Sequence, residues 1–485
     1  MKKIQSIVLA VLGVMLWVIP VMAEETDVII VGAGGAGLSA AIEAVDAGAR
    51  VIVLEKMPVV GGNTNYATGG INAAGTPQQE AKGIKDSQKL FFDDTMKGGH
   101  SLNNPELVEV LTSNAKDTVA WLVGLGADLS DVGRLGGHSV NRSHRPAGGG
   151  AVGKEIVTTL RNAAKDRSID IRTRTTVIRI IQDPAGNVTG VGIKNRSGKE
   201  LEISAKAVVL TCGGFGASKD KVSNYRPEFA QFGTTNHPGA TGDGIDLSRP
   251  LGVQFVDLDQ IQTHPTVVPG KGIMITEAVR GNGAILVNRA GKRFVDEMTT
   301  RDVVSNAIIA QQDSTSYLFF DQGVRESLKA IEGYVRLKLM TEGATLKDLA
   351  GGIGIDAANL EDTVARYNEA VATGKDSAFN RSTMPRRLDR PVYYAIEVSP
   401  AVHHTMGGIK INAHAEVIGR QNKPVAGLYA AGEATGGVHG ANRLGGNALA
   451  DITVFGRIAG KKAAAYAATV NTGAYSFGAE MIAAQ

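Results

Sequence analysis

The chain of 485 residues is long enough for two or three domains with a large buried core. Its hydrophobic content of 43% and charged content of 20% are those of an ordinary globular protein and exclude a disordered chain. The 51 Lys and Arg against 48 Asp and Glu leave a formal net charge of only +3, which argues against nucleic acid as a partner. A single cysteine, Cys212, and the lack of a CxxCH motif predict no disulfide, no metal site and no haem on this chain.

The first 23 residues have the pattern of a secretory signal peptide. Two lysines precede an apolar run from residue 7 to residue 21, and Ala23 offers the small residue that a signal peptidase requires. The run is short for a membrane span, although a retained anchor is the alternative interpretation. We therefore predict export to a bacterial periplasm without stable membrane insertion.

The segment after the signal predicts a βαβ unit. β-branched residues predict a strand at 28–31, an alanine-rich segment predicts a helix at 36–47, and an apolar run predicts a second strand at 51–54. Further along, short apolar runs separated by turns at 173–214 predict a small antiparallel addition.

Three glycines, Gly32, Gly34 and Gly37, form a GxGxxG motif between the first predicted strand and helix. Such glycines let the backbone approach a pyrophosphate, while the helix N-terminus supplies N–H donors and a partial positive charge. Glu55 stands at the end of the second strand, where its carboxylate can accept ribose hydroxyls. This context predicts a dinucleotide site rather than a structural turn.

A second glycine-rich segment favours FAD over NAD. The stretch VGGNTNYATGGINAAG at 60–75 has no charged residue, and its backbone amides can follow a longer cofactor to a flavin ring. The C-terminal motifs AAGE and LGGNALAD predict another strand–turn–helix unit whose helix N-terminus can face the flavin. The residues of the first stretch that we assign to FAD are Asn63, Thr64, Gly69 and Gly70.

Nucleotide-binding character is interrupted in the middle of the chain and returns near its end. Between residues 261 and 402 the composition shifts to mixed helix and strand with more charge. We therefore predict an α/β fold in which a Rossmann-like FAD-binding domain is split by an inserted α+β capping domain, or clamp domain. The predicted boundaries are 1–23 for the signal peptide, 24–258 and 404–485 for the FAD-binding domain, and 259–403 for the capping domain.

Four stretches outside these motifs are rich in groups that bind carboxylates or move protons: QTHPT, MITEAVRGNGA, TTRD, and HHTMGG with GANRLGG. Taken one at a time, they have ordinary structural explanations, such as a loop histidine or a helical ion pair. His403 and Arg443 lie in neutral, glycine-flanked surroundings, however, where a buried charge needs an anionic partner. We predict that Arg443 and His403 bind one substrate carboxylate, and that His264 and Thr276 bind a second.

These motifs together resemble the flavoprotein subunits of the fumarate reductase and succinate dehydrogenase superfamily, and most closely the soluble periplasmic flavocytochrome c branch. The resemblance runs from about residue 24 to residue 468. It implies noncovalent FAD, because membrane-bound relatives carry the covalent flavin on a histidine at the position of Asn63. It also implies further residues around the cofactor: Ala36, Val177, Asp243, His404, Glu433, Ala448 and Leu449.

The resemblance also implies a reaction and a proton donor. Hydride transfer from flavin N5 to an activated C=C leaves a carbanion beside a carboxylate, and the resembling enzymes protonate it with an arginine, which falls here on Arg301. Glu277, which also lies at the substrate, and Arg280 are implied to return the proton to Arg301. An arginine can act as the acid because the incipient carbanion is a far stronger base than water. We therefore expect reduction of fumarate to succinate in anaerobic respiration.

Alternatives remain for the substrate and for the class of protein. Methacrylate or acrylate stays open, whereas urocanate reductases of the same branch usually carry tyrosine and aspartate at the positions of His264 and Glu277. An oxidase or dehydrogenase such as L-aspartate oxidase is a second interpretation, and a flavin electron carrier without a substrate is a third. The resembling flavocytochromes carry a tetrahaem domain where this chain has its signal, so we expect electrons from a separate periplasmic multihaem c-type cytochrome.

Overall fold

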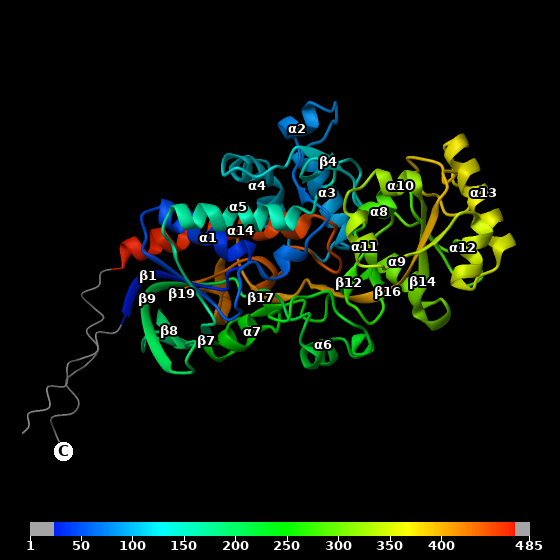
Figure 1. Ribbon diagram of the computed structural model, residues 1–485. Helices are drawn as coiled ribbons and strands as arrows, with labels where there is room; N and C mark the ends of the chain where they lie inside the picture. The colour runs from blue at the N-terminus through cyan, green and yellow to red at the C-terminus, as the bar shows by residue number, and fades with distance from the viewer. Residues whose placement is uncertain (1–23, 471–485) are drawn as a thin grey trace, which may run out of the picture.

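The computed structural model describes residues 24–470, so the predicted signal peptide at 1–23 lies outside the described residues, as does the segment 471–485. Figure 1 shows the strands and helices from the two ends of the chain gathered in one half of the molecule, and those from the middle of the chain gathered in the other half. Each half is built around its own sheet.

The large sheet has eight strands in the order β18-β19-β9-β1-β2-β6, with β8 and β7 continuing from β9. Its strands are β1 (Glu24–Val31), β2 (Val51–Glu55), β6 (Asp170–Thr173), β7 (Thr176–Gln182), β8 (Val188–Lys194), β9 (Glu200–Leu210), β18 (Glu416–Ile418) and β19 (Pro424–Ala430). β1 pairs in parallel with β2 and β9, whereas β7, β8 and β9 pair antiparallel. The antiparallel addition predicted at 173–214 is therefore confirmed.

Two helices from opposite ends of the chain, α1 (Gly35–Asp46) and α14 (Asn447–Thr469), pack closely against each other over this sheet (Figure 1). Small residues permit the approach, because a Cβ at Gly456 would lie 2.6 Å from Ala36 O and a Cβ at Gly460 would lie 2.1 Å from Ala40 O. Within residues 24–470, no helix combines the length and apolar character needed to cross a bilayer. The other helices of this half are α2 (Pro77–Glu80), α3 (Gln88–Gly98), α4 (Pro105–Gly124), α5 (Val152–Asp166), α6 (Lys219–Tyr225) and α7 (Asp243–Ser248).

The βαβ unit predicted at the start of the chain is present as β1, α1 and β2, with bounds within a few residues of those predicted. The segment Val28–Val31 is completely or almost completely buried. Strands of a parallel sheet that is covered by helices are expected to be continuously apolar, and this segment is. The glycine turn that follows β1 thus lies at the carboxyl end of the sheet, where ligands of such folds bind.

The second sheet has the order β12-β11-β16-β14-β13, with β15 also paired to β16. Its strands are β11 (Ile261–Val268), β12 (Ile273–Met274), β13 (Ile285–Val287), β14 (Ser316–Asp321), β15 (Thr341–Gly343) and β16 (Tyr393–Thr405). Its helices are α8 (Ala278–Gly281), α9 (Arg301–Ile309), α10 (Gln322–Glu326), α11 (Ile331–Arg336), α12 (Leu346–Ile353) and α13 (Ala357–Thr373). Its own apolar core includes the fully buried side chains of Phe319, Phe320 and Ile396.

The described residues also form two three-stranded sheets. One contains β10 (Phe255–Val256), β17 (Gly408–Lys410) and β20 (Thr435–Gly436), and the other contains β3 (Ile71–Asn72), β4 (Asp131–Gly133) and β5 (Ser143–Arg145). In β3, the Asn72 side chain donates hydrogen bonds of 2.7 Å to Gly445 O and Asn447 Oδ1. These bonds fix the end of the glycine-rich stretch at 60–75 against the start of α14.

The connection of the two halves shows that one is inserted into the other. β9 and β19 are parallel neighbours in the large sheet, with Val208 opposite Leu428, although the whole second sheet lies between them in the sequence. The predicted fold class, a split α/β nucleotide-binding domain with an inserted α+β capping domain, is therefore confirmed. We call the half built on the second sheet the capping region, residues 261–405.

Candidate active site

Two connected cavities run from the carboxyl end of β1 to the capping region. The first begins at the glycine turn after β1, and the second has a volume of about 710 Å³ and reaches Arg301 in α9. Asn63, Thr64, Glu433 and Ile452 line both cavities. A long molecule such as a dinucleotide can therefore occupy both at once.

The first cavity has the features of a pyrophosphate and ribose site. Gly32 has φ +102°, and a Cβ there would lie 2.6 Å from Thr211 O, so only glycine fits this turn. The N-cap of α1, Gly34, provides no side-chain cap, which leaves the helix N-terminus open to an anion. The buried carboxylate of Glu55 accepts hydrogen bonds from Ala33 N at 2.9 Å and Met57 N at 2.7 Å, and these bonds hold it at the cavity wall.

Gly37, the third glycine of the motif, does not line either cavity. A Cβ at this position would lie 1.9 Å from Gly32 O and 2.7 Å from Thr211 Oγ1. Its assignment to the cofactor stays a prediction. The structure shows that glycine at this position permits the close packing of α1 on the end of β1.

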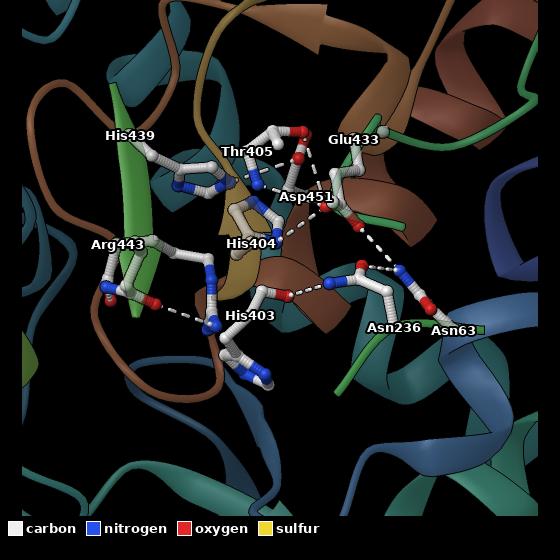
Figure 2. Close-up of polar contacts among 12 residues, drawn as sticks. Asn63, Asn236, His403, His404, Thr405, Glu433, His439, Arg443 and Asp451 are labelled. Atoms are coloured by element: carbon white, nitrogen blue, oxygen red, sulfur yellow. Dashed lines mark hydrogen bonds and ion pairs between the residues drawn. The ribbon is translucent and has the colours of Figure 1, made fainter. Parts of the chain in front are cut away.

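Asn63 lies at the junction of the two cavities and is held by the protein on both sides. Its Nδ2 donates to Asn236 Oδ1 at 2.7 Å and to Glu433 Oε2 at 3.2 Å, while its Oδ1 accepts from His237 N at 2.7 Å. Figure 2 shows Asn63, Asn236 and Glu433 joined by these bonds. Burial raises the pKa of Glu433, although hydrogen bonds from Thr405 and Asn63 oppose this effect.

His404, at the end of β16, lines the second cavity and has one unpaired ring nitrogen. Its Nδ1 lies 3.6 Å from Glu433 Oε1, whereas its buried Nε2 has no partner among residues 24–470. Behind it stands His439, whose ring centroid is 5.4 Å from that of His404 and whose Nε2 lies 3.2 Å from Asp451 Oδ2 (Figure 2). Burial keeps the pKa of His404 well below its ordinary value, with Arg443 adding to the effect, so its ring is neutral.

The N-terminus of α14 also opens onto the second cavity. Its N-cap, Gly446, lacks a side-chain cap, and Ala448 and Leu449 in its first turn line the wall. An uncapped helix N-terminus favours an electron-rich carbonyl or an anion. The uncapped ends of α1 and α14, together with the unpaired Nε2 of His404, are the donors that the two ends of FAD require, so the residues present fit this cofactor.

Arg301 and Glu277 form a buried ion pair in the second cavity. Arg301 Nε donates to Glu277 Oε2 at 2.8 Å, and the other carboxylate oxygen of Glu277 accepts from Gly136 N. Burial by itself would raise the pKa of Glu277, but Arg301 and Arg280 outweigh burial and lower it to about 2. The carboxylate is therefore ionised and Arg301 is held by it.

Gln262 joins Arg301 to Arg443. Its Oε1 accepts from Arg301 Nη1 at 3.2 Å and from Arg443 Nη2 at 3.1 Å, and its Nε2 donates to Asn442 Oδ1 and Arg443 O. Burial and the charge of Arg301 lower the pKa of Arg443 to about 9, which still leaves it protonated at neutral pH. Sequence reasoning missed Gln262, although it is the first residue of the QTHPT stretch.

His264 and His403 form a neutral pair at the same wall. Their ring centroids are 5.1 Å apart, and His403 Nδ1 lies 2.7 Å from the hydroxyl of Thr235, a residue that sequence reasoning missed. Burial and the nearby arginines keep the pKa values of both histidines well below the ordinary value. His264 Nε2 is buried and has no partner within the described chain, so it is available to a ligand.

Arg280 stands behind the cavity wall rather than in it. It is fully buried, donates from Nη1 to Glu297 O at 2.7 Å, and has Nη2 at 3.7 Å from Glu277 Oε2. Burial lowers its pKa to about 10, with Glu277 opposing this effect. Arg280 is thus separated from the cavity by Glu277, and the relay from Arg280 through Glu277 to Arg301 stays a prediction.

The structure brings the other predicted site residues to the walls of the cavities. Those on the first wall are Gly32, Gly34, Ala36, Glu55, Asn63, Thr64, Val177, Asp243 and Glu433. Those on the second wall are Asn63, Thr64, Gly69, Gly70, His264, Thr276, Glu277, Arg301, His403, His404, Glu433, Arg443, Ala448 and Leu449. Their placement is thus established, whereas their individual roles stay predictions. Among residues 24–470, no three His, Cys, Asp or Glu side chains are grouped as a metal ion would require.

Comparison with known proteins identifies the relatives of the chain. The family model of the FAD binding domain matches residues 27–449. A protein of Shewanella frigidimarina named fumarate reductase (cytochrome) is 52% identical, over 91% of this chain and 78% of its own length. A urocanate reductase of Eggerthella lenta is 35% identical, over 92% of this chain and 76% of its own length.

A solved structure agrees with this assignment. The open conformation of a flavocytochrome c3 fumarate reductase superposes with a TM-score of 0.77 at 45% identity, covering 92% of this chain and 79% of the other. The chain therefore belongs to the FAD-binding flavoproteins of the fumarate reductase family, and it is an FAD-dependent oxidoreductase that acts on CH–CH groups.

Proposed function

We propose that the protein reduces the C=C bond of fumarate to give succinate. The observation that carries this proposal is the joining of two buried arginines, Arg301 and Arg443, by Gln262 in one cavity whose histidines are neutral. Glu277 balances only one of these cations, because its carboxylate is bound to Arg301. A small dicarboxylate supplies the missing negative charge.

The roles of the binding residues follow from their free donors. Arg443 and His403 bind one carboxylate, and His264, through its unpaired Nε2, binds the other together with Thr276. Bound FAD supplies the hydride that adds to one alkene carbon. The neutral histidines donate hydrogen bonds without adding charge, so the substrate stays oriented while charge develops on the second carbon.

Arg301 gives the proton to that second carbon. Its Nε and Nη1 are bound to Glu277 and Gln262, whereas Nη2 makes no hydrogen bond within the described chain and is the atom free to donate. The fixed guanidinium is a weak acid, which a carbanion can deprotonate and water cannot. Glu277, which is 2.8 Å from Nε, returns a proton that reaches it through Arg280.

The setting of the reaction is also a proposal. We infer that FAD is held without a covalent bond, because position 63 is an asparagine bound to Asn236 and Glu433. The N-terminal signal pattern supports export to the periplasm, and a separate multihaem cytochrome that carries electrons to the bound FAD fits this location. We assign residues 24–258 and 404–485 to the FAD-binding domain and 259–403 to the capping domain.

The test uses purified protein with FAD, under anaerobic conditions, with reduced viologen as electron donor. Fumarate, methacrylate, acrylate and urocanate are offered in turn, and oxidation of the viologen is followed. Fumarate is expected to give the highest kcat/KM. A preference for methacrylate contradicts the assigned substrate, and no oxidation with any of them indicates an electron carrier. Arg301→Ala is expected to abolish turnover while FAD stays bound.

A further inference from the structure

The outer end of the second cavity is marked by exposed residues. Tyr66 and Leu337, which line it, are 50% and 55% exposed, whereas Arg301 and Arg443 at its inner end are buried. Tyr66 belongs to the FAD-binding half and Leu337 belongs to the capping region. The entrance is therefore bounded by both halves of the molecule.

Lys154 lies on the wall of this entrance that belongs to the FAD-binding half. It is exposed, it stands in the first turn of α5, and it makes no ion pair or side-chain hydrogen bond within residues 24–470. The start of α5 is fixed, because Gly153 N donates to Ala67 O at 2.9 Å and a Cβ at Gly153 would lie 1.9 Å from Thr64 O. Its neighbour Glu155 is engaged elsewhere and accepts from Asp128 N.

Lys271 lines the same cavity from the capping region, in the turn between β11 and β12. It too is exposed and without a side-chain partner in the described chain. This turn is also fixed, because a Cβ at the adjacent Gly272 would lie 2.8 Å from Thr234 O, and Thr235 is hydrogen-bonded to His403. Lys271 also lies shortly before Thr276 in the chain, a residue that we assign to substrate binding.

Within residues 24–470, no acidic residue that lines the cavity forms an ion pair with either lysine. The acidic residues of the cavity wall, as far as the structure describes it, are Glu277 and Glu433. Glu277 is paired with Arg301, and Glu433 lies at the junction with the first cavity. A dianion that enters thus meets cations at the entrance and again at Arg301 and Arg443.

We propose that Lys154 and Lys271 form a cationic entrance that captures the dicarboxylate and guides it to Arg301 and Arg443. This inference rests on the proposed function, because it requires a substrate with two negative charges. The attraction between a fixed cation and a dianion about 10 Å away in water raises the local concentration of the dianion about fourfold at low salt. Two lysines together therefore raise kcat/KM about tenfold, and screening removes the gain.

The experiment measures kcat and kcat/KM for fumarate with wild type, Lys154→Gln, Lys271→Gln and the double variant, at ionic strengths of about 0.01 M and about 1 M. The double variant is expected to lose about tenfold in kcat/KM at low salt, with kcat unchanged, and to match wild type at high salt. Lys462→Gln is the matched control, since Lys462 is exposed, unpaired within the described chain and outside both cavities. The double Lys→Arg variant is expected to keep wild-type values.

The outcomes separate this inference from the function on which it rests. If wild type does not reduce fumarate, the proposed function fails. If wild type reduces fumarate and the double Gln variant has the same kcat/KM at low salt, or loses kcat instead, the cationic entrance is wrong. A loss that persists at high salt also contradicts it, because it would indicate a contact rather than a charge effect.

Discussion

Arg301 Nε lies 2.8 Å from Glu277 Oε2, and both side chains are buried. The pKa of Glu277, which burial alone would raise, is lowered to about 2 by Arg301 and Arg280. Glu277 is thus an ionised acceptor across the neutral range, and it fixes the guanidinium that faces the cavity. In the proposed mechanism, both the orientation and the reprotonation of Arg301 depend on this carboxylate.

Glu277→Gln keeps the shape of the side chain but removes its charge and basicity. We expect kcat for fumarate reduction to fall by about 10²–10⁴, because a positioned proton-transfer group contributes that much. FAD content should stay at the wild-type level, since Glu277 does not line the first cavity. Glu332→Gln, which removes the partly exposed partner of Arg325, is the control and should keep kcat. A Glu277→Gln enzyme with near-normal kcat would show that the relay is wrong.

Gln262→Met removes the oxygen that accepts from both Arg301 and Arg443. Two buried guanidinium groups then lose a shared acceptor, at a cost of about 1–3 kcal/mol. We expect kcat/KM for fumarate to fall by about 10–100-fold, which steady-state kinetics will measure. Gln254→Met is the matched control, since Gln254 bonds Gly419 O outside both cavities. Equal kinetics for the two variants would refute a joining role for Gln262.

Sequence reasoning succeeded where the local pattern determines the structure. The order of strand, glycine turn and helix, followed by Glu55, predicts the dinucleotide site. His403 and Arg443 were predicted as binding residues because a charge in glycine-rich, neutral surroundings needs an anionic partner. Gln262 carries no such signal, because a neutral amide in a strand is equally suited to solvent. Its role becomes visible only when β11 pairs with β16 and residues 442–443 approach it.

The predicted site residues lie at different depths, which the sequence did not indicate. Gly37 and Arg280 lie directly behind the cavity walls, whereas the other members of their motif and cluster line these walls. Which member of a motif reaches a ligand and which packs against the backbone depends on tertiary distances such as the 1.9 Å between a Cβ at Gly37 and Gly32 O. A spacing pattern does not encode such distances.

Succinate should stabilise the FAD-loaded protein. The cation of Arg443 is buried, which lowers its pKa to about 9, and a bound carboxylate offsets this cost. At a concentration 100 times its Kd, a ligand adds about 2.7 kcal/mol to the free energy of unfolding. Thermal denaturation should show a Tm that rises with succinate in wild type and stays constant in Arg443→Met. Propionate, with one carboxylate, should produce the smaller shift, and an equal shift would argue against two carboxylate sites.

Acid should destabilise the protein in two steps. Burial keeps the pKa values of His264, His403 and His404 well below 6.5, so the unfolded chain binds their protons first, and stability present above about pH 6.5 is lost below it. Each histidine contributes a slope of about 1.4 kcal/mol per pH unit. Below pH 4.5, protonation of Glu277 in the unfolded chain adds a further loss. Urea denaturation from pH 7.5 to 5 should show this dependence of the free energy of unfolding on pH. The slope should be smaller by about 1.4 kcal/mol per pH unit, the contribution of one proton, in His264→Asn. A free energy of unfolding that does not change with pH would contradict the prediction.

Gly37→Ala and Gly83→Ala test the steric interpretation of the first glycine motif. A Cβ at Gly37 would lie 1.9 Å from Gly32 O, so α1 must move away from the end of β1 and the cradle for the pyrophosphate opens. Gly83 lies outside both cavities, no atom lies within 4 Å of an added Cβ there, and its φ of +66° costs about 1 kcal/mol. We expect Gly37→Ala to lose bound FAD and a few degrees in Tm, because overpacking a core costs about 1–3 kcal/mol and a chain of this length shifts by about 1–2 °C per kcal/mol. Gly83→Ala should retain FAD, and absorbance of the flavin after gel filtration distinguishes the two. Full FAD content in Gly37→Ala would show that α1 tolerates a shift here and that the packing contact is not essential.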